Sequence, residues 1–242
     1  MENYGTDTYG ERIADIYDNW YGPPEDSSIT LLSDLAYHGR ALELGIGTGR
    51  IALPLKKKGI DIHGIDASPS MVKKLRGKPD GKSIPVSFGD FSEVAVEGKY
   101  DLIFVVFNTF FSLITQEAQL ECLQNVAKHL TSGGAFLIEA FIPDLGRFDR
   151  GQSVRATHVG ENSVKIDVSN HNPLKQLVTS QHVILTDNGV RLCPVTIRYT
   201  WPSELDMMAR VAGMKLADRW GDWERGVFSS TSGKHISIYK LI

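Results

Sequence analysis

The sequence predicts an α/β protein with a doubly wound, mostly parallel sheet, a helical N-terminal segment and an inserted antiparallel β region. Three observations support this prediction. Short apolar runs alternate with amphipathic helical stretches between residues 40 and 141. Helical spacing of apolar residues precedes them within residues 1–39. Strand-like runs without helical periodicity follow from Ser153 to Tyr199.

The N-terminal segment has the apolar spacing of helices. Ile13, Ile16, Tyr17 and Trp20 recur every three or four residues, as on one helix face. Gly-Pro-Pro at residues 22–24 ends this pattern, because proline cannot continue a helix. We expect a second helix from about residue 28 to residue 37.

The middle of the chain alternates between strand and helix. The run from Tyr100 to Phe107 is nearly all apolar, as expected for a strand that is buried on both faces. Right-handed crossovers would make these strands parallel. The expected strands are Arg40–Leu44, Asp61–Ile65, Val86–Gly89, Tyr100–Phe107 and Ala135–Phe141, and the expected helices are Arg50–Lys58, one that starts at Ser68, and Glu117–Leu130.

The pattern changes near residue 150. Strand-like runs occupy residues 164–168, 178–185 and 190–199, and Asp-Asn-Gly at 187–189 is a strong hairpin turn. Helix and strand patterns then return. We therefore expect a helical lid at 1–39, a main α/β domain formed by 40–150 and 201–242, and an inserted antiparallel region at 151–200.

Composition narrows the function classes. The 242 residues include 26 basic and 29 acidic side chains, which argues against a nucleic-acid partner. Cys122 and Cys193 lack metal-ligand spacing, so we expect reduced thiols, a cytoplasmic location and no metal site. The first residues lack the basic and apolar regions of a signal peptide, so we expect none, and no apolar run approaches the roughly 18 residues needed for a membrane span.

A glycine-rich turn follows the first strand of the sheet. Residues 41–50 read ALELGIGTGR, so Gly45, Gly47 and Gly49 stand between a strand and a helix. Such a turn offers outward-pointing amides to an anion or a cofactor. Dinucleotide sites favour G-x-G-x-x-G, whereas this chain has G-x-G-x-G and Arg50 in place of the third glycine. A dinucleotide also leaves Glu43 unexplained.

Two acids follow the next strands at the same edge of the sheet. Asp66 lies 21 residues after Gly45, where a carboxylate can accept both hydroxyl groups of a ribose. Asp90 follows the third strand and suits an adenine amino group. Met71 suits the face of the adenine. The sequence therefore predicts an adenosine-containing cofactor at this edge.

Together these segments resemble the motifs of class I S-adenosylmethionine (SAM)-dependent methyltransferases. The motifs are ELGIGTG at 43–49, GIDASPSM at 64–71, GDF at 89–91, YDLI at 100–103 and LTSGG at 130–134. They cover about residues 40–141. The inserted β region is similar to that of bacterial small-molecule methyltransferases, including aminosugar N-methyltransferases. The resemblance implies a Rossmann-like fold, SAM as cofactor and S-adenosylhomocysteine as product.

The resemblance also implies which residues hold each part of the cofactor. Gly45 and Gly47 would let the backbone approach the methionine moiety, and Glu43 would meet its amino group. Asp66 would hold the ribose. The other positions are Ala67 and Met71 beside the adenine, Gly89, Asp90 and Phe91 at its edge, Phe107 at the sulfonium, and Tyr9 and Tyr17 in the lid over the methionine end.

Several of these residues keep a second interpretation. Arg50 is either a partner for the cofactor carboxylate or an exposed helix residue. Met71 has the spacing of a helix core residue, and Asp90 could cap a turn. Tyr17 could be plain core, as could Trp20.

The acceptor pocket is less specified than the cofactor site. The segment after Tyr100–Phe107 lacks the Asn/Asp-Pro-Pro-aromatic signature of base-amino methyltransferases, and no Pro-Cys nucleophile is present, which again argues against nucleic acid. Trp201 serves either packing or substrate stacking. We expect an apolar small-molecule pocket built from Trp20, Phe110, Phe111, Phe141 and Trp201.

The predicted reaction is in-line transfer of a methyl group to nitrogen or oxygen of a small, partly apolar metabolite, and natural-product biosynthesis is one setting for it. Low-ranking catalytic candidates are Tyr17 and His158; His171 in the same β region ranks no higher. The main alternative is a SAM-binding fold member that catalyses another reaction or acts as a regulatory partner. An NAD-linked oxidoreductase is a further alternative. A homodimer is a possible assembly.

Overall fold

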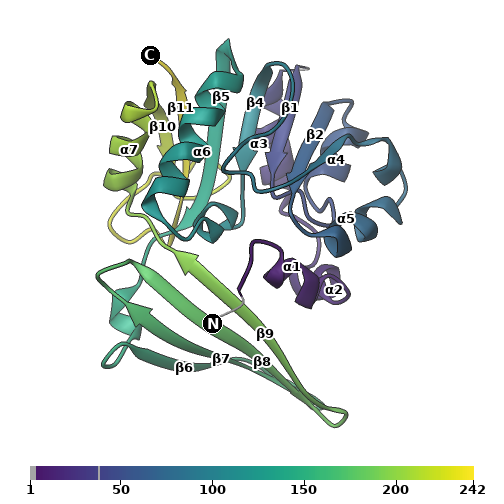
Figure 1. Ribbon diagram of the computed structural model, residues 1–242, viewed down its shortest axis with the longest axis vertical. Helices are drawn as coiled ribbons and strands as arrows, with labels where there is room; N and C mark the ends of the chain where they lie inside the picture. The colour runs from purple at the N-terminus through teal and green to yellow at the C-terminus, as the bar shows by residue number, and fades with distance from the viewer. Residues whose placement is uncertain (1–3, 38) are drawn as a thin grey trace.

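The computed structural model describes residues 4–37 and 39–242 and confirms the predicted fold class (Figure 1). Its main sheet has the strand order β10-β11-β5-β4-β1-β2-β3. β1 to β5 run parallel, and β11 and β10 add two antiparallel pairings at one edge. The strands are β1 (Arg40–Leu44), β2 (Asp61–Asp66), β3 (Val86–Phe88), β4 (Tyr100–Val105), β5 (Leu130–Phe141), β10 (Met214–Trp220) and β11 (Lys234–Leu241).

Helices cover both faces of this sheet because the apolar side chains of its strands alternate between two cores. In β4, Ile103 and Val105 pack with α6 and α7, while Leu102 and Phe104 pack with α3 and α4. This alternation follows from the two-residue period of a strand. The helices are α3 (Asp26–Ala36), α4 (Ala52–Lys57), α5 (Pro69–Arg76), α6 (Gln116–His129) and α7 (Pro202–Val211).

A second sheet lies between β5 and α7 in the chain and is an antiparallel meander in the order β6-β7-β8-β9. Its strands are β6 (Gln152–Val159), β7 (Ser163–Asn172), β8 (Leu177–Thr186) and β9 (Gly189–Arg198). Arg198, at the end of β9, is buried and pairs with Glu204 of α7 at 2.6 Å. Its guanidinium also donates to Gln119 of α6. These bonds join the second sheet to the helices of the main domain.

The N-terminal segment forms two short helices, α1 (Thr8–Ile13) and α2 (Tyr17–Tyr21), between the main sheet and the second sheet (Figure 1). Glu11 accepts from the hydroxyl of Ser68 at 2.6 Å and from the amide of Ser70 at 2.9 Å. On the other side, Asp15 pairs with Arg191 of β9 at 2.6 Å. The segment is therefore tied to both sheets.

Some boundaries differ from the sequence prediction. β5 begins at Leu130, so the LTSGG motif starts this strand instead of forming a turn before it. β6 was absent from the predicted runs, because polar residues alternate with Val154, Ala156 and Val159 and the strand is mostly exposed. Within residues 4–37 and 39–242, no helix combines the length and the apolar character that a membrane crossing requires.

Candidate active site

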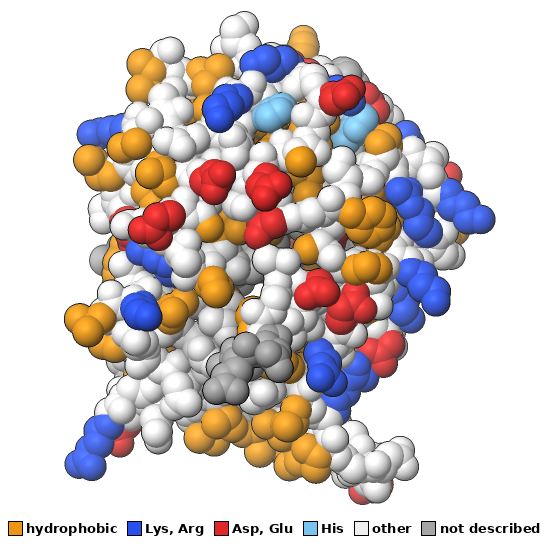
Figure 2. Space-filling view, in the orientation of Figure 1, with side chains coloured by type: hydrophobic (Ala, Val, Ile, Leu, Met, Phe, Trp, Pro, Cys, Tyr) orange, Lys and Arg blue, Asp and Glu red, His pale blue; other side chains and the backbone are white. Residues whose placement is uncertain are grey.

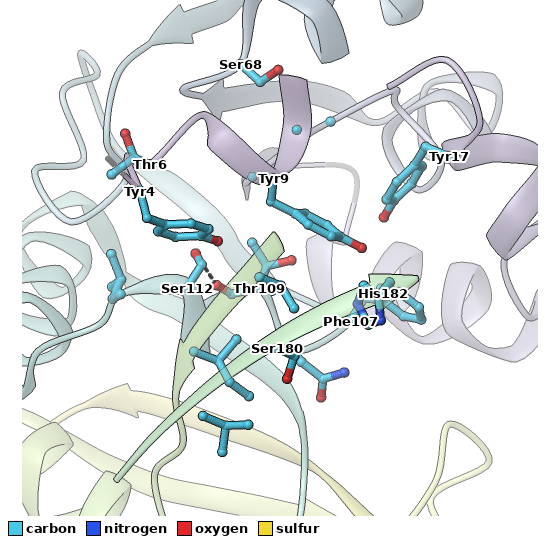
Figure 3. Close-up of a pocket in the computed structure, with 18 of the residues that line it drawn as sticks. Tyr4, Thr6, Tyr9, Tyr17, Ser68, Phe107, Thr109, Ser112, Ser180 and His182 are labelled. Carbon is cyan, nitrogen blue, oxygen red and sulfur yellow. Dashed lines mark hydrogen bonds between the residues drawn. The ribbon is translucent and has the colours of Figure 1, made fainter. Parts of the chain in front are cut away.

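A cavity of about 550 Å³ opens where the parallel strands end, near the switch point between β1 and β4. Its walls come from the N-terminal segment, the loops after β1 to β4, and the inner face of the second sheet (Figure 3). Ligands in doubly wound folds bind outside the carboxyl ends of the strands. The predicted site and this cavity therefore coincide in the fold.

The glycine-rich turn presents bare backbone to the cavity. Gly45 and Gly47 both line it, with φ angles of +75° and +55° that favour glycine. A Cβ atom on Gly45 would stand 2.5 Å from the side-chain methyl of Thr109. A side chain at this position would therefore fill the space where the backbone can approach a ligand.

Asp66 lines the cavity and is held in one orientation by two backbone amides. Gly47 donates to its Oδ2 at 2.6 Å, and Ser68 donates to its Oδ1 at 2.8 Å. Burial raises the pKa of Asp66, and the two amide hydrogen bonds oppose that shift. Each carboxylate oxygen has a second lone pair, so Asp66 can still accept from a ribose diol.

Glu43 is buried beneath the glycine turn and does not line the cavity. Its Oε2 has no hydrogen-bond partner within the described part of the chain. Burial raises its pKa well above the ordinary value, whereas the nearby Arg50 guanidinium lowers it. A buried carboxylate oxygen without a partner fits the predicted neighbour, the ammonium group of a cofactor.

The adenine end combines residues from two segments, which follow β2 and β3. Ala67, Met71, Asp90 and Phe91 all line the cavity, while Gly89 does not. Asp90 accepts from the amide of Ser92 at 2.8 Å, so it also caps a turn. Met71 is both lining and core, because it packs against Ile13 of α1. Met71 and Asp90 therefore line the cavity and also serve as a core residue and a turn cap.

The rim after β4 has an unusual backbone. Phe107 and Asn108 are consecutive non-glycine residues with φ angles of +57° and +65°. Glu139 of β5 accepts from the amide of Phe107 at 2.9 Å and from Trp223 at 3.1 Å. Asn108 Oδ1 accepts from the amide of Phe141 at 2.7 Å. These bonds hold Phe107 at the cavity in a left-handed conformation that phenylalanine rarely adopts.

Aromatic rings of the N-terminal segment close over this rim. The hydroxyls of Tyr9 and Tyr21 are 2.6 Å apart, and the Tyr21 ring packs against Phe107 at 4.8 Å. Tyr17 packs on Tyr21 at 4.8 Å, and burial raises its pKa to about 12. The Arg50 guanidinium lies 4.7 Å from the centre of the Phe107 ring. Arg50 is therefore half-buried against the rim, although it does not itself line the cavity.

The second sheet contributes a polar wall that sequence analysis missed. Ser169 and Ser180 stand opposite each other in β7 and β8, with hydroxyls 2.7 Å apart. In the next pair on the same face of the sheet, two residues along each strand, Asp167 and His182 form a hydrogen bond of 2.5 Å. Arg155 of β6 lies opposite Asp167. The signal for this wall is the alternation of polar and apolar residues along β6 to β8.

Five expected pocket or catalytic residues lie elsewhere. Phe110 and Phe111 are fully buried in the core, because the turn at Asn108 directs the following 3-10 turn (Thr109–Ser112) inward. Trp20 packs between the N-terminal segment and His182 of the second sheet and does not line the cavity. Trp201 is 38% exposed before α7, and His158 is exposed on edge strand β6. Of the expected pocket aromatics, only Phe141 lines the cavity.

Fold and cavity together define a class of protein. The glycine-rich turn after β1, the carboxylate of Asp66 after β2 and the Asp90–Phe91 segment after β3 fit the methionine, ribose and adenine parts of SAM. Within the described residues, no cluster of three or more His, Cys, Asp or Glu side chains could hold a metal ion.

Comparisons with known proteins identify the family. A methyltransferase domain model matches residues 41–134. The structure of the CcbJ methyltransferase from Streptomyces caelestis superposes with a TM-score of 0.91 at 36% identity, over 98% of this chain and 99% of that one. The cypemycin N-terminal methyltransferase of a Streptomyces species is 25% identical over 95% of this chain and 96% of its own length.

A more distant structure shares the fold. SAM-bound CalS10, an amino pentose methyltransferase from Micromonospora echinaspora, has a TM-score of 0.69 at 18% identity, over 94% of this chain and 97% of that one. The chain belongs to the methyltransferase family and is a SAM-dependent enzyme.

Proposed function

We propose that this enzyme methylates an amine nitrogen of a small, hydroxylated natural product. The observation that carries the proposal is Asp167, a carboxylate on the cavity wall opposite the cofactor edge. Its only ion-pair partner within the described residues is His182, at 2.5 Å. A cationic amine is the functional group that such a carboxylate attracts most strongly.

The rest of the wall supports a hydroxylated acceptor. Ser153, Ser169 and Ser180 lie in one cross-strand row, and all three line the cavity. Hydroxyl groups both donate and accept hydrogen bonds, which suits a substrate that carries several hydroxyls. The names of two similar proteins support an amine acceptor, since one is an N-terminal methyltransferase and the other is an amino pentose methyltransferase.

The parts of the chain take distinct roles in this proposal. Residues 40–150 and 201–242 hold the cofactor, and residues 151–200 bind the acceptor. Residues 1–39 act as the lid. Asp66 holds the ribose, Asp90 and Phe91 read the adenine edge, and Glu43 with Arg50 serves the two charges of the methionine end.

SAM, when bound, supplies a methyl group on a positively charged sulfur, and the sulfur keeps the bonding electron pair when the methyl group is transferred. The protein must then align the acceptor and exclude water. Tyr9, Tyr17 and Tyr21 cover the methionine end, and Phe107 borders it. Orientation of this kind supplies up to roughly 7–11 kcal/mol in favourable model reactions.

The test is methyl transfer from SAM with a deuterated methyl group to a panel of amines, including aminosugars and peptide N-termini. Each amine is paired with the matching alcohol. We expect the label on nitrogen and one S-adenosylhomocysteine per methyl group by mass spectrometry. Transfer only to alcohols, or none to any amine, would contradict the proposal.

A further inference from the structure

Asp167 and His182 form a hydrogen-bonded pair inside the cavity. They stand directly opposite each other in β7 and β8, and the Nδ1 atom of His182 lies 2.5 Å from Oδ1 of Asp167. Both side chains are partly exposed and both line the cavity. Since an ionised carboxylate only accepts, this hydrogen bond requires a proton on Nδ1, and in the neutral ring Nε2 then carries the lone pair.

The imidazole ring is fixed from several sides. The ring of Trp20 packs edge-on to it at 5.4 Å, and that of Tyr9 at 6.3 Å. Figure 3 shows His182 on the side of the cavity towards which the Tyr9 and Tyr17 hydroxyls point. The titratable and charged groups around the pair are Tyr9 of α1, Tyr21 of α2, Arg147 of the turn before β6, Arg155 of β6, Lys165 of β7, and Arg191 and Cys193 of β9.

An amine acceptor must lose a proton before it can attack. Simple alkylamines such as lysine have pKa values near 10.4, so the free amine is scarce at neutral pH. A base in the cavity with its orientation fixed by a carboxylate removes that obstacle. Within the described residues, Nε2 of His182 makes no hydrogen bond, and it is not among the buried polar atoms that lack a partner.

We propose that His182 is the general base of the reaction and that Asp167 is its positioning residue. This proposal rests on the proposed function, because it needs an ammonium substrate. One N–H bond of the ammonium breaks and its electron pair stays on nitrogen. The proton moves to Nε2, and Asp167 stabilises the resulting imidazolium. The proton then leaves to water after the product departs.

The experiment compares His182→Gln and Asp167→Asn with wild type, using the amine methylated best in the panel. His158→Gln is the matched control, since His158 lies on the same sheet outside the cavity. We expect kcat/KM of His182→Gln to fall about 100-fold or more at pH 7. The deficit should shrink as the pH approaches the pKa of the amine, where no base is needed.

A readout without cofactor separates positioning from general damage. The hydrogen-bonded Nδ1 proton of His182 should give a downfield NMR signal in wild type and lose it in Asp167→Asn. The proposal is overturned if His182→Gln matches the control, or if its deficit is the same at every pH. If wild type methylates no amine at all, the proposed function falls as well.

A different observation carries a second inference: the second sheet is apolar on its outer face. Alternate residues of its strands face away from the cavity and form cross-strand rows. Val154 is 69% exposed and Leu192 is 52% exposed. Figure 2 shows hydrophobic side chains gathered along the lower border, where Figure 1 places this sheet. The rows are Val154, Val168, Gln181 and Pro194; Ala156, Ile166, Val183 and Leu192; and Val159, Val164, Leu185 and Val190.

The dimensions of this face suit a second copy of the chain. Four strands of eight to ten residues span roughly 600 Å² at ordinary strand spacing, before side-chain relief is counted. Stable interfaces bury about 600–1,000 Å² per partner, so this face lies at the lower end of that range. The charged residues of these strands, such as Arg155 and Asp167, point into the cavity instead. An apolar face whose rows carry no charged side chain can pack against the same face of a second copy across a two-fold axis.

We infer that two copies associate through this outer face. Sedimentation velocity on wild type, Leu192→Glu and Val168→Glu tests the inference, with Val227→Glu as a control at a more exposed apolar residue outside the second sheet. We expect wild type and control to be dimeric at micromolar concentration, and both sheet variants to be monomeric with an unchanged melting midpoint. A monomeric wild type, or dimeric sheet variants, would overturn it.

Discussion

Glu139 should be the residue on which the shape of the rim after β4 depends most. Its carboxylate accepts from the Phe107 amide, from Trp223 and, at 3.2 Å, from Lys234. Lys234 has a second partner in Glu25, so its loss counts least. Two charge-assisted hydrogen bonds at about 1.5–3 kcal/mol each then set the scale. Glu139→Ala should lower the free energy of unfolding by about 3–6 kcal/mol.

The strained backbone makes the effect reach the site. The left-handed conformation costs about 1 kcal/mol or more at each of Phe107 and Asn108, and the hydrogen bond to Glu139 offsets part of this cost. Without that carboxylate the turn should relax and affinity for S-adenosylhomocysteine should fall. Urea unfolding and calorimetry measure the two effects. If Glu139→Ala lowers the free energy of unfolding by less than about 0.5 kcal/mol, no more than the exposed control Glu93→Ala does, the reasoning is refuted.

Three other variants test separate parts of the account. Asp66→Ala should weaken S-adenosylhomocysteine binding at least 10-fold by calorimetry, because the ribose hydroxyls lose their acceptor; unchanged affinity would refute the cofactor map. Gly45→Ala should abolish S-adenosylhomocysteine binding, since the added Cβ would stand 2.5 Å from the side-chain methyl of Thr109. Adding Thr109→Ser to Gly45→Ala removes that methyl and should restore binding only in part, because the positive φ at residue 45 remains. Normal binding by Gly45→Ala would contradict this. Burial lowers the pKa of His235 to about 4, so between pH 6.5 and 4 the unfolded chain binds a proton that the native state does not. Wild type should therefore lose about 3 kcal/mol of stability over that range relative to His235→Asn, and equal slopes would contradict the assignment.

The sequence predicted the parts of the structure that depend on local pattern. The glycine turn, Asp66 and the apolar run of β4 follow from strand and helix periods and from cofactor chemistry, which act over a few residues. The fold class and the family followed from these short-range features.

The acceptor side could not be predicted in the same way. Asp167 and His182 are 15 residues apart, and only the register of β7 and β8 brings them together. Phe110 and Phe111 look like pocket aromatics in the sequence, but the left-handed turn at Asn108 sends them into the core. Long-range register and unusual backbone angles carry no short-range signature.

The measurement that tests the central claim most directly is methyl transfer itself, in wild type and Asp66→Ala, with labelled SAM and paired amines and alcohols. The account predicts label on nitrogen, one S-adenosylhomocysteine per methyl group, and strongly reduced transfer by Asp66→Ala at limiting SAM. Label on oxygen alone, or equal transfer by the two proteins at limiting SAM, would contradict it.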